Sequence, residues 1–168
     1  MESLYSNFVK IKAFIFDVDG VMTDGGLTIL ENGEHLRTFN VKDGWALNKA
    51  KKEGIPVAVI SAGIGVGVRK RLEYLKIPHI FIGVGSKLEI YENLLNELNL
   101  KEEEVAYMGD DIPDLQVLKR VGLPCCPADA VADIVPVCKF VSSKKGGQGA
   151  VRELIEKVLR IQGKWNIE

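Results

Sequence analysis

The chain has 168 residues, of which 46% are hydrophobic and 27% charged, and a formal net charge of −1. This length and composition predict one soluble globular domain, residues 1–168. The charge gives no general attraction to nucleic acid or to an anionic membrane, and no apolar run reaches the roughly 18 residues that cross a bilayer.

The first residues, MESLYSNFVKIK, lack the charged-then-apolar order of a secretory signal, so we expect cytoplasmic residence. Three cysteines are present: Cys125, Cys126 and Cys138. The odd count argues against a disulfide framework, and adjacent cysteines are a poor metal spacing. We therefore expect buried, reduced thiols.

Short apolar runs alternate with helical patterns along the chain. The predicted strands are residues 11–16, 56–60, 79–83, 104–108, 123–126 and 138–141. The predicted helices are residues 44–54, 68–76, 86–100, 114–122 and 149–163. Most of the strands are continuously apolar, as in a parallel sheet that is covered on both faces. We predict an α/β fold, a Rossmann-like parallel sheet flanked by helices with right-handed crossovers.

Residues 26–40 interrupt this alternation directly after the first strand. They read as two strands around Asn32-Gly33, which is a strong hairpin signal. The predicted fold therefore carries a β-hairpin insertion, which serves as decoration, as a lid or as an assembly surface. Further along, SSKKGGQG (142–149) precedes a helix, which predicts either anion binding or a flexible connection.

Polar residues follow the predicted strands at the ends where a parallel sheet binds ligands. Strand by strand they are Asp17 and Asp19, then Ser61, then Lys87, and then Asp110, Asp111 and Asp114. Two like charges 4 Å apart repel by roughly 4 kcal/mol at an effective dielectric constant near 20, so such a cluster needs a cation. A site of oxygen ligands without histidine suits Mg²⁺, which also attracts a phosphate dianion.

These residues predict phosphoryl transfer. Asp17 can attack phosphorus as a nucleophile, and Asp19 can protonate the leaving oxygen and later activate water. Gly20 lets the backbone approach the phosphate, Ser61 can hold a phosphoryl oxygen, and Lys87 can offset charge.

Each residue alone has a plainer explanation. An acidic turn after a strand is common, Ser61 could cap a helix, and Lys87 could be an ordinary solvated lysine. His79, in an apolar strand, is expected in the core, and His35 on the hairpin surface. Two acidic clusters are expected at the same edge of the sheet, and this favours a catalytic site over the separate explanations.

Four segments together resemble the motifs of the haloacid dehalogenase-like phosphatases. They are Asp17 to Val21, Ser61, Lys87, and Gly109 to Asp111 with Asp114. The chain is further similar to the 3-deoxy-D-manno-octulosonate 8-phosphate phosphatase family in the stretches FNVKDG (39–44), VAYMGDDIPD (105–114), VGLPCCPADA (121–130) and KKGGQGAVRE (144–153). The resemblance implies hydrolysis of this sugar-acid phosphate through an aspartyl-phosphate, in lipopolysaccharide precursor synthesis, without a large cap domain.

The resemblance also implies roles for individual residues. Mg²⁺ would be held by the Asp17 carboxylate, the Asp19 backbone carbonyl and Asp110, while Asp111 and Asp114 orient the lysine or metal-bound waters. The residues implied in substrate binding are Asp19, Asn40, Val41, Lys42, Asp43, Gly44, Ser61, Arg71 and Lys87. Among them, Arg71 would face the carboxylate or the phosphate of the sugar acid.

The same resemblance implies a homotetramer that packs through its hairpins and completes each active site from a neighbouring subunit. The terminal GKWNIE, with Trp165, would be disordered or would reach a neighbour's site. Two arginines seen in some relatives are replaced here by Asn48 and Gly63. A nine-carbon sialic-acid-type 9-phosphate therefore stays open as the substrate.

A signalling receiver domain is an alternative of another class, because it also combines an α/β sheet, an acceptor aspartate, Mg²⁺ and a lysine. Receivers carry their acidic pair after the first strand and the acceptor on a later strand. Here Asp19 lies two residues past the candidate acceptor Asp17, which favours rapid dephosphorylation over a stable signal.

Overall fold

The computed structural model describes residues 3–166. Its centre is a six-stranded sheet in the order β5-β4-β1-β6-β7-β8, and every neighbouring pair is parallel. The strands are β1 (Ala13–Phe16), β4 (Val57–Ser61), β5 (His79–Ile82), β6 (Val105–Met108), β7 (Leu123–Cys126) and β8 (Phe140–Val141). All six lie within or next to the predicted runs, so the predicted Rossmann-like parallel sheet is confirmed.

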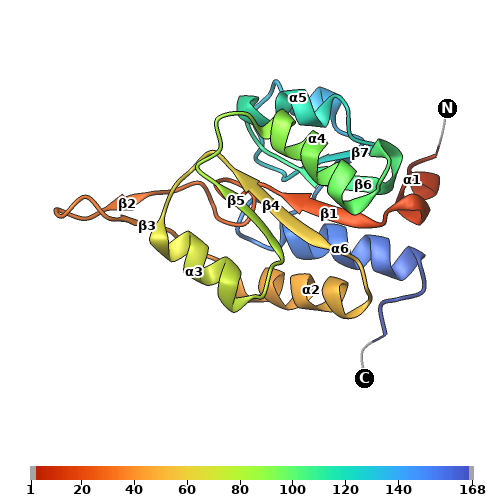
Figure 1. Cartoon of the computed structure of the whole chain (residues 1–168), viewed down its shortest axis with the longest axis horizontal. Helices are drawn as coiled ribbons and strands as arrows, with labels where there is room; N and C mark the ends of the chain where they lie inside the picture. Colours follow the sequence, from red (N-terminus) through yellow and green to blue (C-terminus); the bar gives the residue numbers. More distant parts are fainter. Residues whose placement is uncertain (1–2, 167–168) are drawn as a thin grey trace.

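Helices cover both faces of the sheet, as Figure 1 shows with α4 and α5 above it and α2, α3 and α6 below. The helices are α1 (Leu4–Lys10), α2 (Val41–Lys52), α3 (Val66–Tyr74), α4 (Lys87–Leu98), α5 (Leu115–Leu118) and α6 (Ala150–Ile161). Alternate residues of β1 enter opposite cores: Phe14 and Phe16 pack with α2 and α6, while Ala13 and Ile15 pack with α4 and α5. The continuously apolar strands are therefore explained by burial on both faces.

Several details differ from the prediction. Helix α1 was not predicted, although Ser3 caps it by accepting a hydrogen bond from the Ser6 amide. The helix predicted at 114–122 is α5, only four residues long, preceded by the 3₁₀ turn η2 (Ile112–Asp114). His79 is half-buried and lies 3.5 Å from Glu97, so the prediction of a core histidine is wrong.

The hairpin is confirmed but its strands are short. They are β2 (Thr28–Ile29) and β3 (His35–Leu36), and both are exposed, as predicted for His35. Gly33 has φ +84°, a conformation that glycine adopts without strain. The hairpin projects from the sheet at the left of Figure 1.

The thiols of Cys125, Cys126 and Cys138 are free, as predicted; the first two are buried and the third is half-buried. Trp165 is also buried, and its ring packs edge-on against Trp45 of the same chain, with centroids 5.4 Å apart. Ile167 and Glu168 of the terminal segment lie outside the described residues. That residues 1–168 form one domain stays a prediction.

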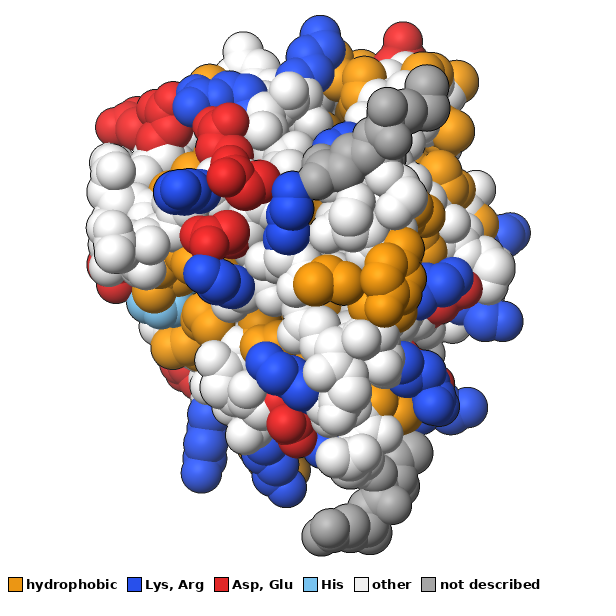
Figure 2. Space-filling view, turned by 90° about the vertical axis from the view of Figure 1, so that its right-hand side faces the viewer, with side chains coloured by type: hydrophobic (Ala, Val, Ile, Leu, Met, Phe, Trp, Pro, Cys, Tyr) orange, Lys and Arg blue, Asp and Glu red, His pale blue; other side chains and the backbone are white. Residues whose placement is uncertain are grey.

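The surface mixes charges of both signs. On the face drawn in Figure 2, Lys and Arg side chains lie among Asp and Glu side chains. Arg120 pairs with the exposed Glu92 and the half-buried Glu102, and such solvent-accessible pairs each contribute little to stability. Within residues 3–166, none of the helices has the length and hydrophobicity that a bilayer span requires.

Candidate active site

The parallel register brings the predicted strand ends together. Phe16, the last residue of β1, lies beside Val59 of β4 and Met108 of β6. The residues that follow β1, end β4 and follow β6 therefore meet at one rim. They line a cavity of about 250 Å³, and its polar side chains are Asp17, Asp19, Ser61, Lys87, Asp110 and Asp111.

Lys87 is the central cation of this cavity. It is the first residue of α4, directly after the cap Ser86, whose hydroxyl accepts a hydrogen bond from the Glu89 amide. Its Nζ lies 2.6 Å from Asp17 Oδ2 and 2.7 Å from Asp114 Oδ1. Burial lowers the pKa of Lys87, but the two carboxylates outweigh this effect and raise it above its usual value. Lys87 is thus a buried, charged residue, and the plainer expectation of a solvated lysine is wrong.

Asp114 is fully buried and holds the lysine in place. Its Oδ1 accepts a hydrogen bond of 2.5 Å from the Tyr107 hydroxyl, and its Oδ2 accepts one of 3.2 Å from the Asp110 amide. The lysine-orienting role expected for Asp114 fits this geometry. Tyr107 was not predicted, because an inward-facing tyrosine in an apolar strand gives no sign of which acid it will meet. Asp111 instead accepts a hydrogen bond from the Ile112 amide at the start of η2.

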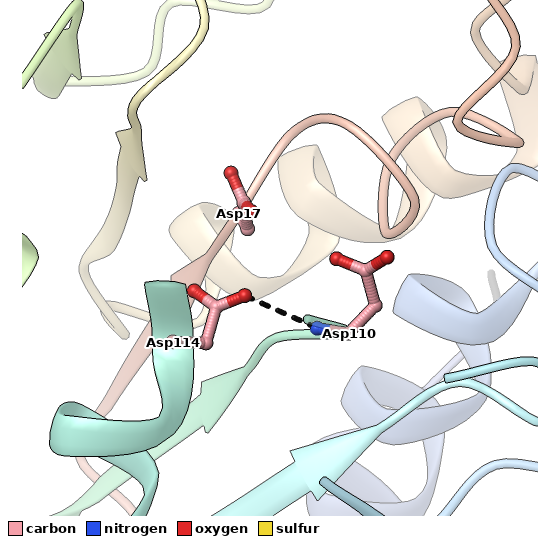
Figure 3. A group of neighbouring side chains, drawn as sticks. All are labelled: Asp17, Asp110 and Asp114. Carbon is pink, nitrogen blue, oxygen red and sulfur yellow. Dashed lines mark hydrogen bonds between the residues drawn. The ribbon is translucent and has the colours of Figure 1, made fainter. Parts of the chain in front are cut away.

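Three carboxylates converge beside this lysine. Asp17, Asp110 and Asp114 each offer an oxygen, and these oxygens lie within 4.8 Å of one another. In Figure 3, Asp17 lies at the end of β1, Asp110 in the loop after β6 and Asp114 in η2. Burial first, and neighbouring carboxylates second, raise the pKa of Asp17 to about 6 and that of Asp110 to about 7. The cluster therefore holds more negative charge than Lys87 offsets.

The surroundings of Asp110 fit a metal ligand. Among residues 3–166, its carboxylate accepts no hydrogen bond, unlike those of Asp17 and Asp114. Gly20 has φ +79°, and a Cβ there would lie 2.0 Å from Asp110 Oδ2. Only glycine therefore leaves room for this carboxylate. Hard oxygen donors with surplus negative charge suit Mg²⁺.

The raised pKa values predict how pH affects the metal-free protein. An aspartate in an unfolded chain has a pKa near 3.8, whereas burial and neighbouring carboxylates raise the pKa of Asp17 to about 6 and that of Asp110 to about 7. Between these values the folded chain binds more protons than the unfolded chain, so the free energy of unfolding falls as pH rises through this range. We expect Mg²⁺ to raise the melting temperature more at a pH of about 8 than at about 5. Equal shifts in thermal denaturation at both pH values would contradict this.

Asp19 is held by a residue that the sequence did not indicate. Arg37, just after β3, donates from Nε to Asp19 Oδ1 at 2.6 Å and from Nη2 to Oδ2 at 3.2 Å. The two residues are 18 positions apart, so no short motif joins them. Ser61 is buried at the end of β4, where its hydroxyl accepts a hydrogen bond from the Gly63 amide and caps no helix.

The predicted substrate segment, residues 40–44, lies outside the cavity lining. Asn40 caps α2 by accepting a hydrogen bond from the Lys42 amide at 2.8 Å, and its Nδ2 donates to the Gly147 carbonyl at 3.1 Å. Val41 and Lys42 are exposed. Asp43 is buried and accepts a hydrogen bond of 2.8 Å from the Arg152 amide at the start of α6.

Arg71 lies behind this segment on α3. A Cβ on Gly44 would lie 2.7 Å from its Nη2, so the guanidinium packs directly against that glycine. Its Nε is buried without a hydrogen-bond partner among the described residues. The structure thus groups Arg71 with Gly44 and leaves both outside the lining of the aspartate cavity.

The glycine-rich segment 142–149 supports the loop that carries Asp19. The Gly147 amide donates to the Val21 carbonyl at 3.0 Å, and a Cβ on Gly146 would lie 1.9 Å from the Gly20 carbonyl oxygen. Lys144 is exposed at its edge. Close backbone packing explains these glycines, in contrast to the flexible connection that was one of two predictions. The other, anion binding, stays a prediction.

Comparisons with known proteins agree with this geometry. The model of the haloacid dehalogenase-like hydrolase family matches residues 38–128. The 3-deoxy-D-manno-octulosonate 8-phosphate phosphatase of Escherichia coli is 40% identical over 155 residues, which are 92% of this chain and 82% of that relative. The chain belongs to this phosphatase family of haloacid dehalogenase-like hydrolases.

Solved structures of the family share the fold closely. The 3-deoxy-D-manno-octulosonate 8-phosphate phosphatase of Yersinia pestis has a TM-score of 0.93 and 38% identity, covering 96% of this chain and 87% of that one. The phosphatase of Moraxella catarrhalis, in complex with magnesium ion, phosphate ion and a KDO molecule, has a TM-score of 0.92 and 33% identity, covering 96% and 92%.

Proposed function

We propose that this chain is a Mg²⁺-dependent phosphatase that hydrolyses 3-deoxy-D-manno-octulosonate 8-phosphate to the free sugar acid and phosphate, in lipopolysaccharide precursor synthesis. The observation that carries the proposal is the buried Asp17–Lys87 pair at the rim of the sheet in a chain 40% identical to phosphatases of this name. The magnesium, phosphate and KDO bound to the Moraxella catarrhalis relative support the cofactor and the substrate class.

The cavity residues divide the chemistry between them. Asp17 attacks phosphorus, and the bond from phosphorus to the sugar oxygen breaks as Asp19 gives that oxygen its proton. Water then attacks the aspartyl-phosphate and loses a proton to Asp19. The bond between phosphorus and Asp17 breaks, which releases phosphate and restores both acids.

The remaining residues hold the phosphate and its charge. Lys87 and the Ser61 hydroxyl face the cavity in which the phosphoryl oxygens would lie. Mg²⁺, which Asp17, Asp110 and the Asp19 backbone carbonyl would hold, supplies positive charge to the phosphoryl group when bound. Arg71 and residues 40–44 lie outside this cavity lining, and their contact with the sugar acid stays a prediction from the family resemblance.

The hairpin supports a proposal about assembly. Leu27, Ile29, Leu30 and Leu36 are all exposed on it, which is more apolar surface than an isolated lid needs. We propose a cytoplasmic homotetramer that packs through the hairpins and shares each active site with a neighbouring subunit. Light scattering that gives the mass of a monomer would overturn the assembly and the shared site.

Release of inorganic phosphate tests the function. We expect Mg²⁺-dependent turnover of the eight-carbon substrate, with no turnover in EDTA and slower turnover of a nine-carbon sialic-acid-type 9-phosphate. Faster release from the nine-carbon substrate would overturn the assigned specificity. An aspartyl-phosphate that persists for many minutes, without turnover, would instead favour a receiver domain.

A further inference from the structure

Arg37 fixes the carboxylate of Asp19 with an unusually complete contact. The Arg37 side chain is only 5% exposed, whereas that of Asp19 is 34% exposed. Two N–H groups of one planar guanidinium reach the two oxygens of one carboxylate, at 2.6 and 3.2 Å. This paired geometry sets the orientation of a carboxylate as well as its position. A surface ion pair between flexible side chains would not do so.

In the loop after β4, the residues next to the Arg37–Asp19 pair are Gly63 and Gly65, which have no side chain. A Cβ on Gly63 would stand 2.6 Å from Asp19 Oδ2 and 3.5 Å from Arg37 Nη2. A Cβ on Gly65 would stand 3.1 Å from Arg37 Nη1. The two glycines therefore leave a slot beside the loop for the guanidinium and the carboxylate. Any side chain at position 63 would displace Asp19.

From this slot, Asp19 reaches the cavity that we propose as the phosphate site. It lines the same cavity as Asp17 and Ser61, so its position decides how close its oxygens come to the oxygen that leaves phosphorus. We propose that Arg37 is a positioning residue that holds the Asp19 carboxylate at the cavity through one oxygen, while its second hydrogen bond to Asp19 opens when the other oxygen carries the proton for the leaving oxygen. Gly63 and Gly65 provide the room for this pair. The inference rests on the proposed phosphatase function.

The leaving group distinguishes positioning from a general structural role. An alkyl oxygen, as in a sugar phosphate, needs a proton as it leaves, whereas the phenol of p-nitrophenyl phosphate leaves readily without one. The ratio kcat/KM reports the steps up to this departure. We expect Arg37→Met to lower kcat/KM about 10- to 100-fold for the sugar phosphate. For p-nitrophenyl phosphate we expect a loss below about 3-fold.

Matched variants complete the experiment. Arg69→Met removes an exposed arginine and should change neither value, while Arg37→Lys should recover part of the loss on the sugar phosphate. An equal loss on both substrates, or no loss on either, overturns the inference. Should Arg37→Met fail to fold by circular dichroism, Gly63→Ala displaces Asp19 directly, and an equal loss there overturns it too. A wild-type chain inactive on both substrates would overturn the proposed function itself.

Discussion

Asp17→Asn is expected to abolish phosphatase activity, with a loss of at least about 10⁴-fold in kcat. The amide cannot attack phosphorus, and no other carboxylate of the described residues occupies its place. Asp110 approaches from the loop after β6, and Asp114 is fixed by Lys87 and the Tyr107 hydroxyl. Phosphate release from the sugar phosphate in the presence of Mg²⁺ measures the loss.

The fold should survive this change. Asp17 is desolvated beside Asp114, so a neutral side chain removes repulsion as well as an ion pair with Lys87. The melting temperature and circular dichroism should therefore stay near those of the wild type. Asp24→Asn is the matched control, because Asp24 follows in the same loop and is exposed. Among residues 3–166, its side chain accepts a hydrogen bond only from the nearby Gly26 amide. Full activity in Asp17→Asn would end the assignment of the nucleophile.

The sheet and the rim could be predicted because their signals are local. Residues 105–108 are four consecutive apolar residues, and all four are buried between two helical layers. Asp17, Ser61 and Lys87 were predicted to meet because parallel strands carry their next residues to the same edge. Neither prediction depends on how the side chains pack.

The rest depended on tertiary contacts that leave no pattern in the chain. Helix α1 is short, and it lies against α6, where the side-chain Nε2 of Gln162 donates to the Phe8 carbonyl at 3.0 Å. In the sequence, Arg37 looks like an ordinary hairpin residue. The loop with Gly63 comes to lie beside it only in the folded chain. Asn40 is the cap of α2, a role that its residue type explains by itself. The sequence therefore does not indicate whether Asn40 also binds a ligand.

Lys87→Met is expected to destabilise the metal-free protein by about 3 kcal/mol or more at neutral pH, because it leaves two carboxylates buried without their cation. The side chain of Lys87 is 4% exposed and that of Asp114 0%, so water cannot replace the lost charge. Activity should fall as well, since Lys87 faces the phosphate cavity. Urea unfolding in EDTA measures the stability.

The loss of stability in Lys87→Met should depend on whether the Asp114 carboxylate is still present. In Lys87→Met with Asp114→Asn, the second buried charge is removed with the first, so the double variant should be less destabilised than the sum of the two single variants. Of its hydrogen bonds within the described part of the chain, Asp17 then keeps only that of 2.6 Å from the Val18 amide, and it takes up a proton more readily. Lys70→Met, at an exposed position of α3, controls for the loss of a lysine and should leave the unfolding midpoint unchanged. Additive losses would mean that Lys87 and Asp114 act independently, and the lysine would no longer explain how the buried acids are tolerated.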